Sequence, residues 1–132
     1  MILDTSALIA ILRGEPDAIL YAQAIERASV RRISAANFLE AAVVVDGNRD
    51  PIASRRFDDL IAAADIEIVS VTGGQAKLAR EAYRDFGKGS GHPAQLNFGD
   101  CFAYALSKSA REALLFKGAD FIHTDIEPAL TS

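Results

Sequence analysis

The sequence has a single cysteine, Cys101, and only two histidines, His92 and His123, among its 132 residues. One cysteine can form neither an intrachain disulfide nor a cysteine-based zinc site, so both are excluded and a reducing, cytosolic location is the simplest expectation. Two histidines also make a histidine-rich metal site unexpected. If the protein binds a metal, we expect carboxylates to supply the ligands.

Long apolar runs and an excess of positive charge are also missing. No run approaches the roughly 18 apolar residues of a membrane span, and no signal-like segment leads the chain, so we expect no membrane association. A length of 132 residues fits one domain over residues 1–132, and because half of the residues are hydrophobic, we expect that domain to bury a real core. The net charge of -4 argues against a general nucleic-acid coat, unless the acids gather at one place.

Short β-type runs alternate with helical patterns along the chain. Strands are expected over 1–4, 31–34, 66–71 and 113–116, with a fifth over 121–123; helices are expected over 5–12, from Pro16, and over 36–45, 51–64, 75–86 and 97–110. This order predicts an α/β fold of three layers, with a parallel sheet of four to five short strands covered by helices on both faces. Ligands bind at the carboxyl ends of the strands of such sheets.

Several acids are expected near this edge, and each also has an ordinary explanation. Asp4 directly follows the first strand and precedes a helix, where aspartate often serves as an N-cap. Glu40 has no Lys or Arg beside it on its helix face, although it could reach solvent from the helix end. Asp100 follows Asn97 by three residues, the spacing of a capping box. Asp120 and Asp125 could be simple turn residues.

Together, these acids predict a metal site. Two carboxylates about 4 Å apart repel by roughly 4 kcal/mol at an effective dielectric near 20. Hard divalent cations relieve that repulsion, and Asp4, Glu40 and Asp100 on three separate elements could hold Mg²⁺ or Mn²⁺. Such a metal activates water beside a phosphodiester.

Four stretches resemble the PIN-domain ribonucleases, specifically the VapC-type toxins of bacterial type II toxin–antitoxin pairs. They are "MILDTSALIAIL", "SAANFLEAAVVV", "YRDFGKGSGHPAQLNFGDCFAYALSK" and "LLFKGADFIHTDI", and they extend from residue 1 to residue 126. The resemblance implies a PIN-like fold and a metal-dependent endoribonuclease. It places the metal-holding acids at Asp4, Glu40 and Asp100, with the fourth at Asp120, although Asp125 also matches. The family's small polar residue beside the first acid falls on Thr5 or Ser6.

The resemblance also implies partners. Such toxins form homodimers and are silenced by a small antitoxin, whose tail lies over the toxin's N-terminal helices and often sends a basic side chain toward the acids. An apolar groove for it could involve Ile9, Leu12, Ile19, Leu20 and Tyr21, although most of these could equally be core. The candidates for contacting RNA phosphate are Arg13, Lys88 and Lys117.

Two other functions are considered. A phosphoacceptor receiver domain needs an aspartate at the end of its middle strand, where this sequence has Ser70-Val71-Thr72. A catalytically inactive binding module of the same fold would not need the intact acids Asp4, Glu40 and Asp100. Metal-dependent RNA cleavage would separate these possibilities.

Overall fold

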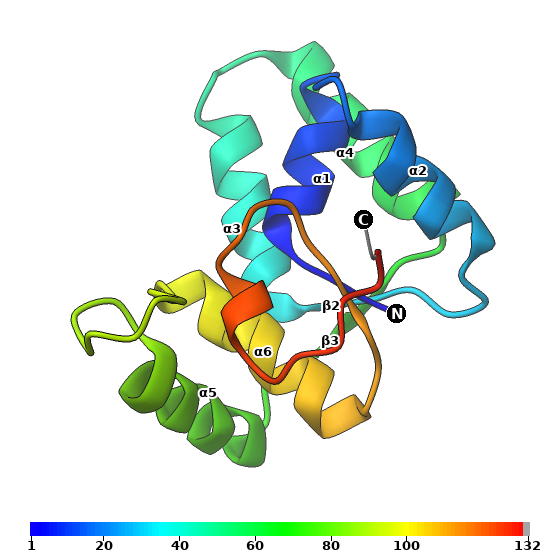
Figure 1. The fold of residues 1–132 in the computed structure, drawn as a ribbon. Helices are drawn as coiled ribbons and strands as arrows, with labels where there is room; N and C mark the ends of the chain where they lie inside the picture. Colours follow the sequence, from blue (N-terminus) through cyan, green and yellow to red (C-terminus); the bar gives the residue numbers. More distant parts are fainter. Residues whose placement is uncertain (131–132) are drawn as a thin grey trace.

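The computed structural model describes residues 1–130, within which no helix is long and apolar enough to cross a membrane. The bounds differ by only a few residues from those expected. The elements follow in the order β1 (Ile2–Leu3), α1 (Thr5–Leu12), α2 (Ala18–Arg27), β2 (Arg32–Ser34), α3 (Ala35–Asp46), α4 (Pro51–Ala63), β3 (Glu67–Val69), α5 (Gly73–Phe86), α6 (Phe98–Ala110), β4 (Leu114–Leu115) and the 3₁₀ helix η1 (Phe121–His123) (Figure 1).

The four strands form one parallel sheet in the order β3-β2-β1-β4. Strand β1 lies between β2 and β4, with Ile2 opposite Leu114 and Leu3 opposite Leu115. Because β1 is an inner strand, the residue that follows it lies at the carboxyl edge of the sheet with a neighbouring strand on each side. That residue is Asp4.

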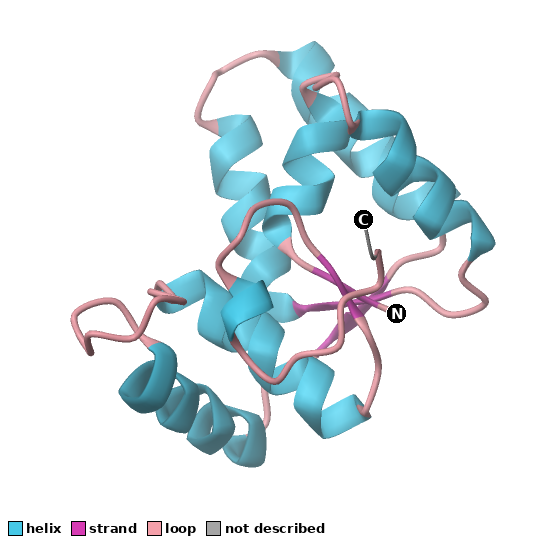
Figure 2. Ribbon diagram, in the orientation of Figure 1, coloured by secondary structure: helices cyan, strands magenta, loops and turns pink. Residues whose placement is uncertain are grey.

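Helices cover both faces of the sheet, as Figure 2 shows around the short central strands. Side chains alternate between the faces along each strand. Ile2 and Leu114 belong to a hydrophobic cluster with residues of α5 and α6, whereas Leu3, Ile33 and Leu115 belong to a second cluster with α1 to α4. The α/β fold with a covered parallel sheet is confirmed.

The expectation of a fifth strand over 121–123 was wrong. The Phe121 carbonyl accepts hydrogen bonds from the backbone N–H (3.0 Å) and the hydroxyl (2.7 Å) of Thr124, and this tight turn forms η1. The chain meets β4 only later, through an isolated bridge between Leu114 and Pro128. The Thr124 hydroxyl bonds the Phe121 carbonyl locally, and such local side-chain bonds compete with the ladder hydrogen bonds of a strand.

Candidate active site

Three predicted acids line one open cleft at the carboxyl edge of the sheet. Asp4 comes from the end of β1, Glu40 from the second turn of helix α3, and Asp100 from the first turn of α6. Thr5, Ser6 and Asn97 also line the cleft. The strand end and the two helices thus bring together residues that are up to 96 positions apart in sequence.

Asp4 is both the N-cap of α1 and a buried cleft residue. Its Oδ2 accepts hydrogen bonds from the backbone N–H (3.1 Å) and the hydroxyl (2.5 Å) of Ser6, and the residue is only 4% exposed. Burial raises the pKa of Asp4 to about 6, and the charge of Glu40 adds to the rise, against the lowering effect of the Ser6 hydrogen bonds. The capping interpretation is correct, but capping does not compensate the buried charge.

Asp100 likewise has two roles. It forms a capping box with Asn97, in which each side chain accepts a hydrogen bond from the other residue's backbone N–H, at 2.9 and 3.0 Å. Burial raises the pKa of Asp100 to about 7, and the charges of Asp4, Asp120 and Glu40 contribute to the rise. The capping box fixes this carboxylate at a helix N-terminus while the cleft holds it near other acids.

Glu40 is held by neighbours rather than by a cation. Its Oε1 accepts a hydrogen bond from the Thr5 hydroxyl at 2.5 Å and a longer one from the Asn37 side-chain amide at 3.4 Å. Among residues 1–130, no Lys or Arg forms an ion pair with Glu40, Asp4 or Asp100. Glu40 is therefore anchored in the cleft by Thr5 and Asn37 and does not extend into bulk solvent from the helix end.

Asp120 and Asp125 differ in what surrounds them. The Asp125 carboxylate accepts a hydrogen bond from the Tyr104 hydroxyl (2.8 Å) and forms an ion pair with Lys108 (2.8 Å). Although burial alone would raise the pKa of Asp125, these two partners hold it below its ordinary value. Asp120 is exposed, and its charge is one of those that raise the pKa of Asp100. The electrostatics therefore favour Asp120 as the fourth acid, which stays a prediction.

The basic residues predicted to contact RNA fall in two places. Arg13 and Lys117 line the acidic cleft, whereas Lys88 is exposed in the loop that follows α5 and does not line it. The Lys117 ammonium is already engaged by Glu15 and, at 2.9 Å, by Asp17. No local sequence pattern indicates this pairing, because the partners lie about 100 residues apart.

The cleft is not a ready-made metal cage. Across residues 1–130, no three His, Cys, Asp or Glu side chains are clustered tightly enough to hold a metal as they stand. The donors nevertheless fit Mg²⁺ or Mn²⁺, because carboxylate oxygens suit these metals and neither Asp4 nor Asp100 forms an ion pair within residues 1–130. Mg²⁺ in proteins commonly binds through one or two carboxylates and keeps several waters, so a closed protein cage is not required.

Comparison with known proteins identifies the family of this chain. The family model described as "PIN domain" matches residues 1–127. The chain is 58% identical over 130 residues to Ribonuclease VapC28 of Mycobacterium tuberculosis, covering 98% of both chains. It is 47% identical over 131 residues to Ribonuclease VapC42 of the same species, covering 99% of this chain and 100% of the other.

Two solved structures share the fold. One is VapC20 of Mycobacterium tuberculosis, described as a sarcin-ricin loop cleaving toxin, with a TM-score of 0.73, 14% identity and 95% coverage of both chains. The other is a chain of a toxin-antitoxin complex from Klebsiella pneumoniae, with a TM-score of 0.67, 20% identity and coverage of 91% of this chain and 88% of that one. A receiver domain is the wrong interpretation, since β3 lies at the sheet edge and not in its middle. The chain belongs to the PIN-domain family and, within it, to the VapC ribonuclease toxins.

Proposed function

We propose that this protein is a Mg²⁺- or Mn²⁺-dependent endoribonuclease toxin that cuts RNA phosphodiesters in the acidic cleft. The observation that carries the proposal is the convergence of Asp4, Glu40 and Asp100 in one cleft without an ion-paired cation among the described residues. Relatives that share about half of its residues or more are named ribonucleases. Unpaired carboxylates at the ligand-binding edge of the sheet are the expected mark of such a site.

Asp4 and Asp100 would hold the metal, with Glu40 and the exposed Asp120 completing the acidic set. A bound metal would supply Lewis acidity toward a phosphate oxygen and lower the pKa of a coordinated water. The protein's own contribution is to fix the carboxylates: Ser6 holds Asp4, Asn97 holds Asp100, and Thr5 holds Glu40. Each anchor limits rotamer freedom before a ligand arrives.

The test is RNA cleavage by the purified protein in Mg²⁺, in Mn²⁺ and in EDTA. We expect cleavage with either metal, none in EDTA, and none with Asp4→Asn at any metal concentration. Cleavage that persists in EDTA would overturn the metal-dependent mechanism. RNA binding without cleavage under all of these conditions would instead support the inactive binding module.

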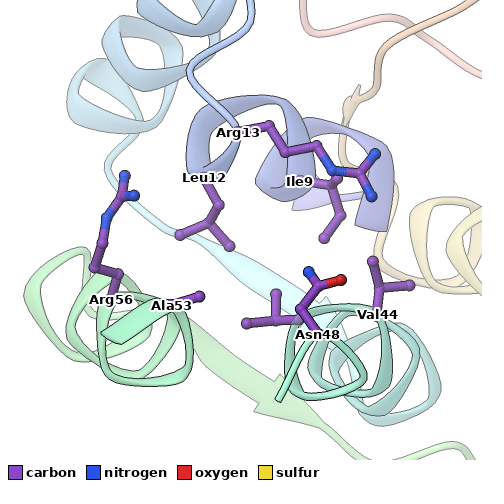
Figure 3. Close-up of a pocket in the computed structure, with 8 residues that line it drawn as sticks. Ile9, Leu12, Arg13, Val44, Asn48, Ala53 and Arg56 are labelled. Carbon is purple, nitrogen blue, oxygen red and sulfur yellow. The ribbon is translucent and has the colours of Figure 1, made fainter. Parts of the chain in front are cut away.

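We also propose that an antitoxin helix silences this toxin by lying over a cavity between α1, α3 and α4 (Figure 3). Ile9 and Leu12 point into the cavity from α1, opposite Val44 and Ala53. Ile9 and Val44 also line the acidic cleft, so the cavity and the cleft are adjacent. A chain lying in the cavity could therefore extend to the acids. The toxin–antitoxin complex that shares this fold is a precedent for such a partner.

The other residues predicted for this groove do not line the cavity. Tyr21 is buried, and Ile19 and Leu20 are exposed on α2. The cavity is tested by Ala53→Arg, which fills it at a position away from the acids. We expect expression of the wild-type chain alone to stop growth and co-expression of its small partner to restore growth. Ala53→Arg should keep RNA cleavage but lose the rescue, and a rescued Ala53→Arg strain would contradict this location.

The homodimer also stays a proposal. Large apolar side chains are exposed on α3 and at the start of α6, at Leu39 (62%), Val43 (61%) and Phe98 (78%). Such side chains are commonly covered in a self-association interface. Sedimentation of the wild type against Val43→Lys tests this: we expect a dimer that the variant weakens.

A further inference from the structure

Asn37 is a polar residue in a place where the fold would be expected to put an apolar one. It lies in α3, its side chain is completely buried, and its Oδ1 has no hydrogen-bond partner. A buried polar atom without a partner costs free energy, and most such atoms in proteins are satisfied. The side chain therefore needs a compensating role, and its amide nitrogen supplies one.

The Asn37 amide joins two elements of the acidic cleft. Its Nδ2 donates a hydrogen bond to the Gly99 carbonyl at 2.9 Å, across 62 residues of sequence, and a longer one to Glu40 Oε1 at 3.4 Å. The Asn37 backbone carbonyl also accepts a hydrogen bond from the Thr5 hydroxyl, at 3.2 Å, and that hydroxyl also binds Glu40. One residue thus contacts α1 and α6 as well as the Glu40 carboxylate on its own helix.

Gly99 is the other half of this contact. It immediately precedes Asp100 and is buried. A Cβ placed on Gly99 would lie 2.0 Å from Glu40 Oε2 and 2.7 Å from Oε1. Gly99 has no unusual backbone requirement at this helical position, so its missing side chain is what makes room for the carboxylate. Any larger residue would displace Glu40.

We infer that Asn37 and Gly99 are positioning residues, which set where Glu40 lies relative to Asp100 and so determine the metal affinity of the cleft. The inference rests on the proposed metal-dependent function. Asn37 fastens the start of α6 to α3, and Gly99 lets the Glu40 carboxylate occupy the space between them. Residues that orient metal ligands without touching the metal typically change its affinity by about 10- to 100-fold.

The experiment measures Mn²⁺ affinity by titration calorimetry, together with the melting temperature in EDTA. Asn37→Ala and Gly99→Ala should each bind Mn²⁺ about 10- to 100-fold more weakly than the wild type. The melting temperature of Asn37→Ala in EDTA should stay within a few degrees of the wild type, because removing the unpartnered Oδ1 offsets the lost hydrogen bonds. The matched control is Ser107→Ala, which removes another buried side-chain hydrogen bond, to the Glu112 carbonyl. It should leave Mn²⁺ affinity unchanged.

The double variant sharpens the test. Since both changes act through Glu40, the combined loss of Mn²⁺ affinity should be smaller than the product of the two single losses. A folded Asn37→Ala or Gly99→Ala protein with wild-type Mn²⁺ affinity would overturn the inference while leaving the proposed function intact. If Asn37→Ala does not fold, Gly99→Ala decides by the same criterion. A wild-type protein that binds neither Mn²⁺ nor Mg²⁺ would instead overturn the proposed function, and this inference with it.

Discussion

Carboxylates at the two ends of the sheet differ in whether a positive charge pairs with them. At the amino end, Arg32 at the start of β2 forms ion pairs with Glu67 (3.0 Å) and Glu112 (2.9 Å), and the Met1 ammonium lies 3.5 Å from Glu112. At the carboxyl end, Asp4 and Asp100 face each other's charge with no ion-paired cation among the described residues. The same fold therefore compensates acids at one end and leaves them uncompensated at the other.

The pKa values express this difference. The carboxylates of Glu67 and Glu112 raise the pKa of Arg32, which stabilises the charged pairs. Burial raises the pKa of Asp4 to about 6 and that of Asp100 to about 7, which disfavours their charged forms. Although each acid caps a helix, its buried charge costs stability, and this cost agrees with the metal site proposed above.

The largest expected effect is on RNA cleavage, which should depend on the acids at the carboxyl end of the sheet and not on those at the amino end. Asp100→Asn keeps the shape and the capping oxygen but removes a charge from the cleft, and it should lower RNA cleavage by more than about 100-fold, since even indirect supports of a metal cost about 10- to 100-fold. Glu67→Gln removes one charge from the amino end and should leave cleavage within about twofold of the wild type. Steady-state cleavage of a fluorescent RNA measures both. Equal losses of RNA cleavage in Asp100→Asn and Glu67→Gln would contradict a special role for the carboxyl end of the sheet.

The second effect is on stability without metal. The pKa of Asp4 is 3.8 in the unfolded chain and about 6 when folded, so its contribution is fully present below pH 3.8 and is lost as the pH rises through about 6. In EDTA, the free energy of unfolding should fall by up to about 3 kcal/mol over that range, for this group alone. Asp4→Asn should remove most of the fall, so it should be more stable than the wild type at pH 7.5 and similar at pH 4.

Urea unfolding in EDTA at the two pH values measures this effect. Added Mg²⁺ or Mn²⁺ should stabilise the wild type at pH 7.5 and have much less effect on Asp4→Asn, because only a ligand of the folded state stabilises it. If Asp4 acted only as an exposed helix cap, its folded pKa would lie below 3.8, and asparagine would remove a rise in stability with pH rather than a fall.

The acids at the carboxyl end of the sheet could be predicted from the sequence, whereas the ion pairs at the amino end could not. The apolar triplet before Asp4, the helical spacing around Glu40 and the Asn97–Asp100 pair each have a local signature, and the topology of a parallel sheet brings their ends together. The sequence pattern presents capping and metal binding as alternatives for Asp4 and Asp100, whereas in the structure each residue caps a helix and also lines the cleft. A capping bond uses one side-chain oxygen, so the two roles do not compete.

Other features depend on contacts between distant segments, which no local pattern encodes. The hydrogen bond from Asn37 to Gly99 spans 62 residues, and the pairing of Lys117 with Glu15 and Asp17 spans about 100. Asn37 could have been suspected because a polar residue three positions before Glu40 lies on the same helix face. Nothing local distinguishes Lys117 from an exposed lysine, or η1 from a short strand.

A smaller effect is expected when the amino end is made to resemble the carboxyl end. Arg32→Met deprives Glu67 and Glu112 of their partner, and Glu112 Oε2 is already buried without a hydrogen bond. The melting temperature should fall by a few degrees, because partly exposed ion pairs contribute little, while RNA cleavage stays unchanged. Differential scanning calorimetry with a parallel cleavage assay measures both. A loss of cleavage larger than the loss of folded protein would show that the two ends are coupled.

The smallest effect concerns the lysines. Lys117 lies at the carboxyl end of the sheet, where Glu15 and Asp17 already neutralise its charge. Lys88 is exposed and forms no ion pair with the described residues. A lysine that contacts phosphate releases about one counterion, so Lys88→Ala should lower the slope of log affinity against log salt by about 1. Lys117→Ala should lower the slope less, because it also frees two acids that repel RNA. Both are measured in an Asp4→Asn background, which prevents cleavage during RNA titration. If the slope is unchanged in Lys88→Ala, or changes more in Lys117→Ala, the RNA phosphate contact lies in the cleft and not in the loop that carries Lys88.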